Sequence, residues 1–407
     1  MPIAPSLGWT LLSREAIKRA ESQLLAETDG VRDEIGFLAI HQAYSDRLFP
    51  GTSVLHTRLR YVLFVPWIFQ RLTTLGSHEP AARRLQEEER RLAGRLRGQD
   101  GVIGGRIYPN HSAQPPSMVY WSAMAKWGLL NPRPDGSMPA RSDALRALVA
   151  SRRGSSRVAD DDRQALESMA HAFVDVPSPP LEWDEPATPL DFRLHRQEAS
   201  FLRTRMSAVE RHDGGGAQAL IAILAERGID LDAVNAPWSS EVLAVADRED
   251  RLVLKRARQA ASLAAVGRAV YAALVEEWRE DVDRQPTGRL HRDDLQETIR
   301  RHRVDALGLE VAALPQDDPA LTKDPILSVL AATQEWLKKQ APLAALRDVY
   351  EDAERRRKGL RRARLGGHLV NRERRLEWQP DQQALAQPLH YRWPQVKRLL
   401  NDLKASR

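Results

Sequence analysis

Cysteine is absent from the 407-residue sequence, which excludes disulfides, thiolate metal sites and cysteine nucleophiles. Long apolar runs are lacking too: the longest, Tyr61–Phe69, covers less than half of the about 20 residues that a membrane span needs. The N-terminus does not have the basic start and apolar core of a secretory signal. We therefore expect a soluble, cytoplasmic protein without a membrane partner.

Motifs for nucleotides, metals and nucleophiles are also missing. The sequence contains no P-loop, no G-x-G-x-x-G after a strand, no H-E-x-x-H and no G-x-S-x-G, so it predicts no cofactor and no catalytic residue. Carboxylates gather in Glu276–Asp281 and His291–Asp294, but interleaved arginines offer them ion pairs at helical spacing. A metal-dependent nuclease or other DNA-processing enzyme with an unrecognised site stays open as an alternative.

Helical periodicity runs through most of the chain. There is no repeat of fixed period and no alternation of strand and helix signals, which argues against a solenoid and against a parallel sheet. The sequence predicts a mainly α fold, with an N-terminal helical domain of winged-helix-like elements and a C-terminal helical domain. The predicted divisions are an N-terminal domain (1–175), a proline-rich linker or strap (176–190), a helical domain (191–350) and a basic, arginine-rich segment with a docking helix (351–407).

Two segments of the N-terminal domain have a helix–break–helix pattern. In the first, Asp33–Phe69, the break at Phe49-Pro50-Gly51 precedes a helix that Thr52 or Ser53 would cap. In the second, Pro116–Leu130, a helix ending at Gly128 would lead into a wing strand. The first turn of the 52–63 helix would then read bases, and the chain would be a sequence-specific transcription regulator. The other interpretation is that both segments are core helices. The polar residues expected at the start of that helix are Ser53, His56, Thr57, Arg58 and Arg60.

Arginine dominates the charge of the chain. Of 61 basic residues only nine are lysine, so 52 are arginine, against 55 acidic residues and a net charge of +6. Residues 341–407 hold 16 basic and eight acidic groups, a net +8, and Arg355–Arg375 holds ten basic residues and one acidic one. Such density repels itself unless an anion is near, and guanidinium groups suit phosphate. A solvated or internally paired helix and an acidic protein partner remain the alternatives. The candidate nucleic-acid contacts are Arg355, Arg356, Arg357, Lys358, Arg361, Arg362, Arg364, Arg372, Arg374, Arg375, Arg58 and Arg60.

Four segments resemble an uncharacterised bacterial family, catalogued as domain of unknown function number 6361. They are Leu7-Gly8-Trp9, the run from Asp33 to Phe69, PPSMVYWSAMAKWGLL (115–130) and YRWPQVKRLLNDL (391–403), and the most specific part is Leu48–Ile68. Members of the family tend to lie in genomic islands beside helicases, phospholipase-D-type nucleases and DNA methyltransferases. The resemblance therefore implies anti-phage defence or DNA modification, by association. The family has no established catalytic residues to carry over.

These observations favour a non-enzymatic DNA-binding or scaffolding subunit of a bacterial anti-phage defence or DNA-modification-linked complex. The arginine-rich segment would contact phosphates, of DNA rather than RNA, and binding would depend steeply on salt and weakly on sequence. Partner proteins such as a helicase or a phospholipase-D-type nuclease would supply ATP hydrolysis or cleavage.

Overall fold

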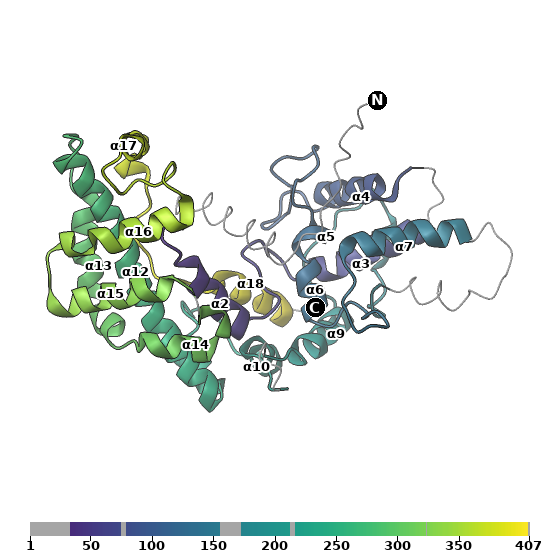
Figure 1. Cartoon of the computed structure of the whole chain (residues 1–407). Helices are drawn as coiled ribbons and strands as arrows, with labels where there is room; N and C mark the ends of the chain where they lie inside the picture. Colours follow the sequence, from purple (N-terminus) through teal and green to yellow (C-terminus); the bar gives the residue numbers. More distant parts are fainter. Residues whose placement is uncertain (1–32, 75–78, 155–171, 212–215, 323, 406–407) are drawn as a thin grey trace, which may run out of the picture. The chain divides into compact units, whose positions relative to one another are not determined.

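The computed structural model of the chain describes residues 33–74, 79–154, 172–211, 216–322 and 324–405 (Figure 1). The regular structure of these residues is helical, and their β-bridges, Leu130 with Phe173 and Glu210 with Gln218, are isolated pairs outside any strand. The predicted mainly α fold is confirmed. Residues 1–32 of the predicted N-terminal domain lie outside the described residues.

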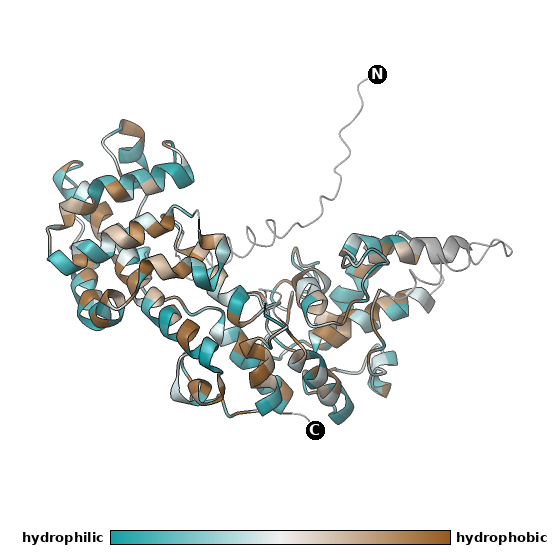
Figure 2. Ribbon diagram, turned by 60° about the horizontal axis from the view of Figure 1, so that its bottom comes forward, coloured by the Kyte–Doolittle hydropathy of each residue, from teal (hydrophilic) through white to brown (hydrophobic). Residues whose placement is uncertain are grey.

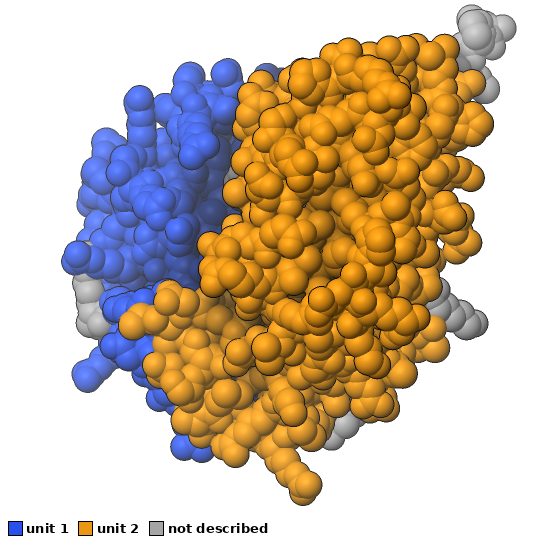
Figure 3. Space-filling model, turned by 90° about the vertical axis from the view of Figure 1, so that its left-hand side faces the viewer, with its two compact units in different colours: residues 1–19, 50–232, 394–407 blue, residues 20–49, 233–393 orange. Residues whose placement is uncertain are grey.

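The described residues divide into two compact units (Figure 3). Unit 1 contains those of 50–232 and 394–405, and unit 2 contains those of 33–49 and 233–393. Along the described residues, the chain thus passes from unit 2 to unit 1, back to unit 2, and finally to unit 1. The divisions predicted at 175, 190 and 350 stay a prediction.

Unit 1 is organised around α3, whose first nine residues, Tyr61–Phe69, are all buried. The side chains of Val62, Leu63, Phe64 and Val65 are completely buried, although Pro66 lies inside the helix. Burial of this apolar stretch in the core was expected from its sequence and is confirmed. The helices of unit 1 are α3 (Tyr61–Thr74), α4 (Ala81–Arg95), α5 (Pro116–Val119), α6 (Trp121–Lys126), α7 (Arg141–Gly154), η1 (Leu181–Asp184), α9 (Arg196–Ser207), α10 (Leu220–Arg227) and α18 (Trp393–Lys404), whose first residue belongs to unit 2.

Unit 2 is organised around the 34-residue helix α12, with α13 packed beside it (Figure 1). The Asp247 side chain caps α12 by accepting a hydrogen bond from the Asp250 amide at 2.7 Å. Alanines buried along its middle let neighbouring helices approach closely. The helices of unit 2 are α2 (Leu38–Leu48), α11 (Ser240–Val245), α12 (Arg248–Asp281), α13 (Leu290–Leu307), η2 (Val311–Ala313), α14 (Leu314–Asp317), η3 (Pro319–Leu321), α15 (Ile326–Lys339), η4 (Leu343–Leu346), α16 (Arg347–Lys358), α17 (Leu369–Leu376) and η5 (Pro380–Gln382).

Most of the longer helices of both units have an apolar and a polar side. Figure 2 shows the two kinds of residue sharing the same helices in both units. The helix α18 is an example, because Val396, Leu399, Leu400 and Leu403 are buried while Lys397 and Lys404 are not. This division is what a helix needs to bury one face against a core and keep the other in water.

The predicted helix beginning at Thr52 or Ser53 is wrong: residues 53–60 form turns, and the helix begins at Tyr61. Tertiary acceptors take the backbone amides that a helix would have used. The Tyr120 hydroxyl accepts from the amides of Thr57 and Arg58 at 2.9 and 3.0 Å, and Asp402 Oδ2 accepts from the Leu59 amide at 2.8 Å. These partners are distant in the sequence, so local helix signals could not reveal them.

The winged-helix element is also corrected. A wing requires paired strands, and Leu130 in the described residues makes only the isolated bridge with Phe173. The helix ends at Gly128, as the sequence predicts: this glycine has φ +68° and follows Trp127, the C-cap of α6. The segment Pro116–Leu130 is therefore a pair of short helices, and Tyr120, Met124 and Trp127 point into the core.

Candidate functional site

The arginine-rich segment Arg355–Arg375 forms one piece of unit 2, made of the end of α16, a loop and most of α17. Asn371 Nδ2 donates to the carbonyls of Leu360 and Ala363 at 3.0 and 2.9 Å, which fastens the loop to α17. Arg374 Nε donates to the carbonyl of Arg361 at 3.2 Å. The predicted basic residues of 355–375 are thus brought together.

Some of these cations hold the fold together. Arg375 is 1% exposed, and its guanidinium donates to both carboxylate oxygens of Asp283, at 2.7 and 2.9 Å. It also donates to the carbonyls of Arg364 and Gly366 at 2.6 and 2.8 Å. Arg375 therefore closes the loop onto the end of α12, and its donors are occupied within the protein.

Lys358 and Arg364 are paired as well. Both bind Glu34, and Lys358 also contacts Glu354 at 3.1 Å. Glu354 is completely buried, and desolvation raises its pKa above the ordinary value. These pairs anchor the arginine-rich segment to the turn that precedes α2.

The remaining seven cations are exposed. They are Arg355, Arg356, Arg357, Arg361, Arg362, Arg372 and Arg374. Five have a carboxylate nearby: Arg355 has Glu351, Arg356 has Asp352, Arg357 has Asp33, Arg372 has Asp283 at 3.8 Å and Arg374 has Glu377. Exposed pairs of this kind are worth only about 0–1 kcal/mol, so phosphate can replace the carboxylate at small cost.

Arg361 and Arg362 have no carboxylate within ion-pair distance in the part of the chain that the structure describes. Arg362 Nε donates to the carbonyl of Lys358 at 3.0 Å. Arg284 is a further exposed arginine close to the arginine-rich segment. It directly follows Asp283, which is the partner of Arg372 and Arg375. Its place was not predicted, since it lies 71 residues before Arg355 and no local charge run surrounds it.

Arg58 and Arg60 belong to unit 1, whereas the arginine-rich segment belongs to unit 2. Arg58 Nε and Nη2 donate to the carboxylate of Asp402 at 2.7–3.0 Å, which ties the 53–60 turns to α18. Arg60 is 2% exposed and forms a two-pronged pair with Glu198 at 2.8 and 3.0 Å. Ser53 and His56, the other residues expected to read bases, are also buried.

The carboxylates considered for a metal site have structural partners. Glu276 is completely buried, and its two oxygens accept from the amides of His291 and Arg292 at 3.0 and 2.9 Å, so that it caps α13. The Thr287 hydroxyl, together with Arg292, lowers the pKa of Glu280. Arg347 pairs with Glu277 and Asp281 at 3.1 and 3.2 Å. The described residues contain no group of three His, Asp or Glu side chains that could hold a metal ion.

The described helices include none that is both long and apolar enough to cross a membrane. Compared with known families, residues 5–344 match a family of unknown function (DUF6361). The chain belongs to this family. The match to DUF6361 ends before the arginine-rich segment, and YRWPQVKRLLNDL also lies beyond it. No curated protein and no solved structure matches the chain significantly.

Proposed function

We propose that this DUF6361 member is a non-enzymatic DNA-binding subunit whose exposed arginines on α16, α17 and the loop between them contact phosphates. The observation that carries the proposal is the gathering of seven exposed guanidinium groups on one short piece of chain. Each presents a planar fork of donors that fits a phosphate with two parallel bonds.

Arg361, Arg362 and Arg374 are the strongest candidates among the seven. The first two have no carboxylate partner in the described residues, and the third lies against the Arg361 carbonyl. The pairs of Arg355 and Arg356 with carboxylates four residues earlier are exchangeable for phosphate. Arg375, Arg364, Lys358, Arg58 and Arg60 have structural partners, and we do not assign them phosphates.

The proposed function includes the anti-phage defence or DNA-modification complex that the family resemblance implies through its genomic neighbours. A subunit that binds only the phosphate backbone of DNA needs partner proteins for ATP hydrolysis or cleavage. A helicase or phospholipase-D-type nuclease from the same genomic island would supply these activities. Pull-down of such partners with the full chain tests this part separately.

The test compares two triple variants of the full chain by fluorescence anisotropy on a labelled duplex across a salt series. One is Arg361→Gln, Arg362→Gln, Arg374→Gln. The matched control is Arg258→Gln, Arg300→Gln, Arg301→Gln, which removes the same charge from exposed positions on α12 and α13. Each lost phosphate contact lowers the slope of log K against log salt by about 0.9, so the first variant lowers it by about 3.

Equal slopes for the two variants would contradict the assignment of the phosphate contacts. No binding by the wild type at low salt would contradict the DNA-binding proposal for the isolated chain. A large preference for one sequence would favour the regulator instead. Magnesium-dependent cleavage that Asp293→Ala or Glu277→Ala abolishes would favour the nuclease.

A further inference from the structure

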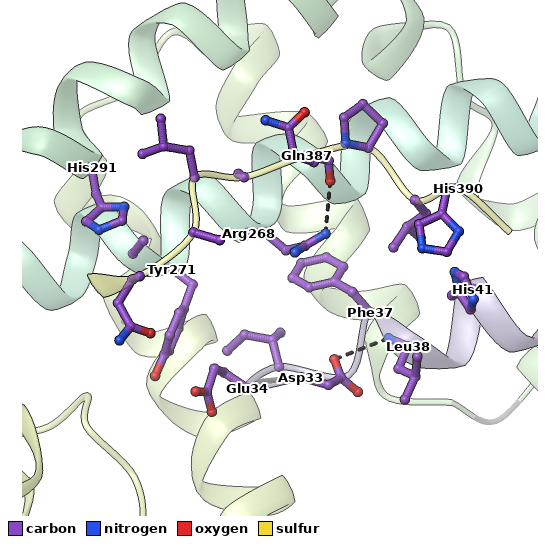
Figure 4. Close-up of a pocket in the computed structure, with 18 of the residues that line it drawn as sticks. Asp33, Glu34, Phe37, Leu38, His41, Arg268, Tyr271, His291, Gln387 and His390 are labelled. Atoms are coloured by element: carbon purple, nitrogen blue, oxygen red, sulfur yellow. Dashed lines mark hydrogen bonds between the residues drawn. The ribbon is translucent and has the colours of Figure 1, made fainter. Parts of the chain in front are cut away.

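Unit 2 contains a cavity of about 460 Å³ that the function proposed above does not use. In Figure 4, Arg268 lies in its centre, His41 and His390 lie at one end, and Tyr271 and His291 lie at the other. Cavities of this size hold small organic ligands in many proteins. Six parts of the chain form the walls: residues within 33–41, 268–272 and 383–390, together with His291, Arg364 and Trp378.

The cavity walls are largely apolar and include the aromatic rings of Phe37, Tyr271 and Trp378. The Tyr271 hydroxyl donates to Glu354 at 2.6 Å, which holds that ring in place. The ring of Trp378 packs against that of His291, with 5.1 Å between the two centroids. The protein thus fixes these aromatic walls before any ligand binds, and such walls favour a flat, apolar molecule.

The carboxylates and guanidinium groups of the lining balance one another. Two are carboxylates, Asp33 and Glu34, and two are guanidinium groups, Arg268 and Arg364. Arg364 pairs with Glu34 at 2.6 Å, and Arg268 Nη1 donates to the carbonyl of Gln387 at 2.9 Å (Figure 4). Burial raises the pKa of Asp33, and nearby arginines, Arg268 among them, oppose this rise. These charges act on one another within the protein, so a charged ligand would be buried here without a counter-charge of its own.

His41 adds a polar atom that a ligand can bind. This residue is 3% exposed, and its Nε2 has no hydrogen-bond partner among the described residues. Burial, with the nearby His390 ring and the cations of Arg392 and Arg268, lowers the pKa of His41 well below the ordinary value, so the ring is uncharged at neutral pH. A buried nitrogen without a partner costs free energy, and a ligand that bonds to it recovers that cost. The Nε2 of a neutral imidazole donates in one tautomer and accepts in the other, and a hydroxyl group pairs with either.

We propose that this cavity binds a small, flat, uncharged aromatic molecule that carries a hydroxyl group. The hydroxyl pairs with His41 Nε2, and the ring lies beside Phe37. These two residues are one helical turn apart, and the His41 amide donates to the Phe37 carbonyl at 3.3 Å, so both side chains contribute to the same wall. Binding here does not depend on whether the arginine-rich segment binds DNA.

The experiment is calorimetric titration of the full chain into three probes of the same shape. They are 2-naphthol, naphthalene, which lacks the hydroxyl, and 2-naphthoate, which carries a negative charge. Two variants test the place of binding: His41→Leu removes the ring nitrogen, and Ala272→Phe fills the cavity from α12. Naphthalene is the matched control for His41→Leu. The matched control for Ala272→Phe is Ala332→Phe, at a half-buried alanine of α15 outside the cavity.

We expect 2-naphthol to bind with one-to-one stoichiometry and 2-naphthoate to bind at least about tenfold more weakly, because burying its charge costs free energy. Naphthalene should bind about fivefold more weakly than 2-naphthol, the loss typical of a neutral hydrogen bond. This difference should vanish in His41→Leu, which should still bind naphthalene like the wild type. Ala272→Phe should abolish binding of all three probes, and Ala332→Phe should bind them like the wild type.

The proposal is overturned if 2-naphthol does not bind, or if 2-naphthoate binds as tightly as 2-naphthol. It is also overturned if His41→Leu keeps the full difference between 2-naphthol and naphthalene, or if Ala272→Phe binds like the wild type. Should circular dichroism show that one of these two variants does not fold, the other decides the place of binding.

Discussion

The ring of Phe37 packs directly on the backbone of α12 at Gly267. A Cβ atom at position 267 would lie 2.8 Å from Phe37 Cε1, closer than real Cβ contacts allow, and 3.1 Å from the Tyr350 hydroxyl, which is a tight contact. Glycine in a helix interior lowers helix stability by roughly 1 kcal/mol relative to alanine. The close packing of Phe37 therefore explains why position 267 holds a glycine. Since Phe37 also lines the cavity, Gly267 determines how near the start of α2 lies to Arg268 and Tyr271.

Gly267→Ala should lower the free energy of unfolding by about 1–3 kcal/mol, because overpacking outweighs the gain in helix propensity. Urea unfolding measures this. Phe37→Leu is smaller at the contact, so the double variant should recover part of the loss and give a favourable coupling energy. A Gly267→Ala protein as stable as the wild type would show that Phe37 moves aside without cost.

Arg375→Lys should destabilise the chain by on the order of 3 kcal/mol although the charge is kept, because an ammonium group cannot reproduce the fork on Asp283 and reach two carbonyls as well. Arg374→Lys is the matched control: the residue is adjacent, exposed and paired with Glu377 at the surface. Urea unfolding of both variants makes the comparison. Equal stabilities would mean that the buried pair contributes no more than a surface one.

The structural role of Arg375 illustrates what the sequence alone could not reveal. Counting charges locally gives ten cations and one anion in 355–375, yet the carboxylates that hold its buried or half-buried cations Arg364 and Arg375 come from distant parts of the chain. Glu34 lies 330 residues before Arg364, and Asp283 lies 92 residues before Arg375. The sequence could predict that cations gather, but which of them face solvent depends on tertiary pairing. The cavity of about 460 Å³ in unit 2 was missed for the same reason, since its walls come from six separate parts of the chain between Asp33 and His390.

Local signals did predict the elements whose stability is local. The helix α12 spans Arg248–Asp281, because alanine-rich sequence behind a polar cap, here Asp247, favours a helix locally. Residues 53–60 have similar local signals, but the Tyr120 hydroxyl and Asp402 compete for their amides. Helix propensity of a few tenths of a kcal/mol per residue does not outweigh such buried hydrogen bonds.

Glu198→Gln should destabilise the chain by about 3–5 kcal/mol, since it leaves Arg60 buried with only part of its partners. Glu198 is 2% exposed and also accepts from the His195 amide at 3.0 Å. Glu297→Gln, in an exposed pair with Arg300 and Arg301, should cost much less. Thermal unfolding of the two variants compares them. The DNA affinity of Arg60→Gln, measured under conditions in which this variant is folded, should equal that of the wild type. A loss of affinity by the folded variant would mean that Arg60 contacts the nucleic acid.

Glu89 should make the stability of the chain depend on pH between about 4.5 and 7. Its Oε1 accepts from the Ser117 amide at 2.7 Å, at the start of α5, and its Oε2 has no hydrogen-bond partner in the described structure. Burial, only partly offset by Ser117 and Arg141, raises the pKa of Glu89 to about 7. The folded chain then holds a proton that the unfolded chain, with an ordinary pKa of 4.5, releases.

The sign follows from this difference in proton binding. The proton on Glu89 contributes to the free energy of unfolding in full below pH 4.5, the pKa in the unfolded chain. This contribution is lost as pH rises through about 7, the pKa in the folded chain, and the total loss is on the order of 3 kcal/mol. Glu89→Gln copies the protonated form and cannot release the proton. Urea unfolding of the wild type and of Glu89→Gln at several pH values isolates the contribution of Glu89 to the free energy of unfolding, because all other groups titrate equally in the two proteins. The wild type should match Glu89→Gln in stability below pH 4.5 and fall behind it by pH 8. A constant difference across that range would mean that Glu89 is ionised in the folded chain throughout, with the Ser117 amide and Arg141 sufficient to hold the charge.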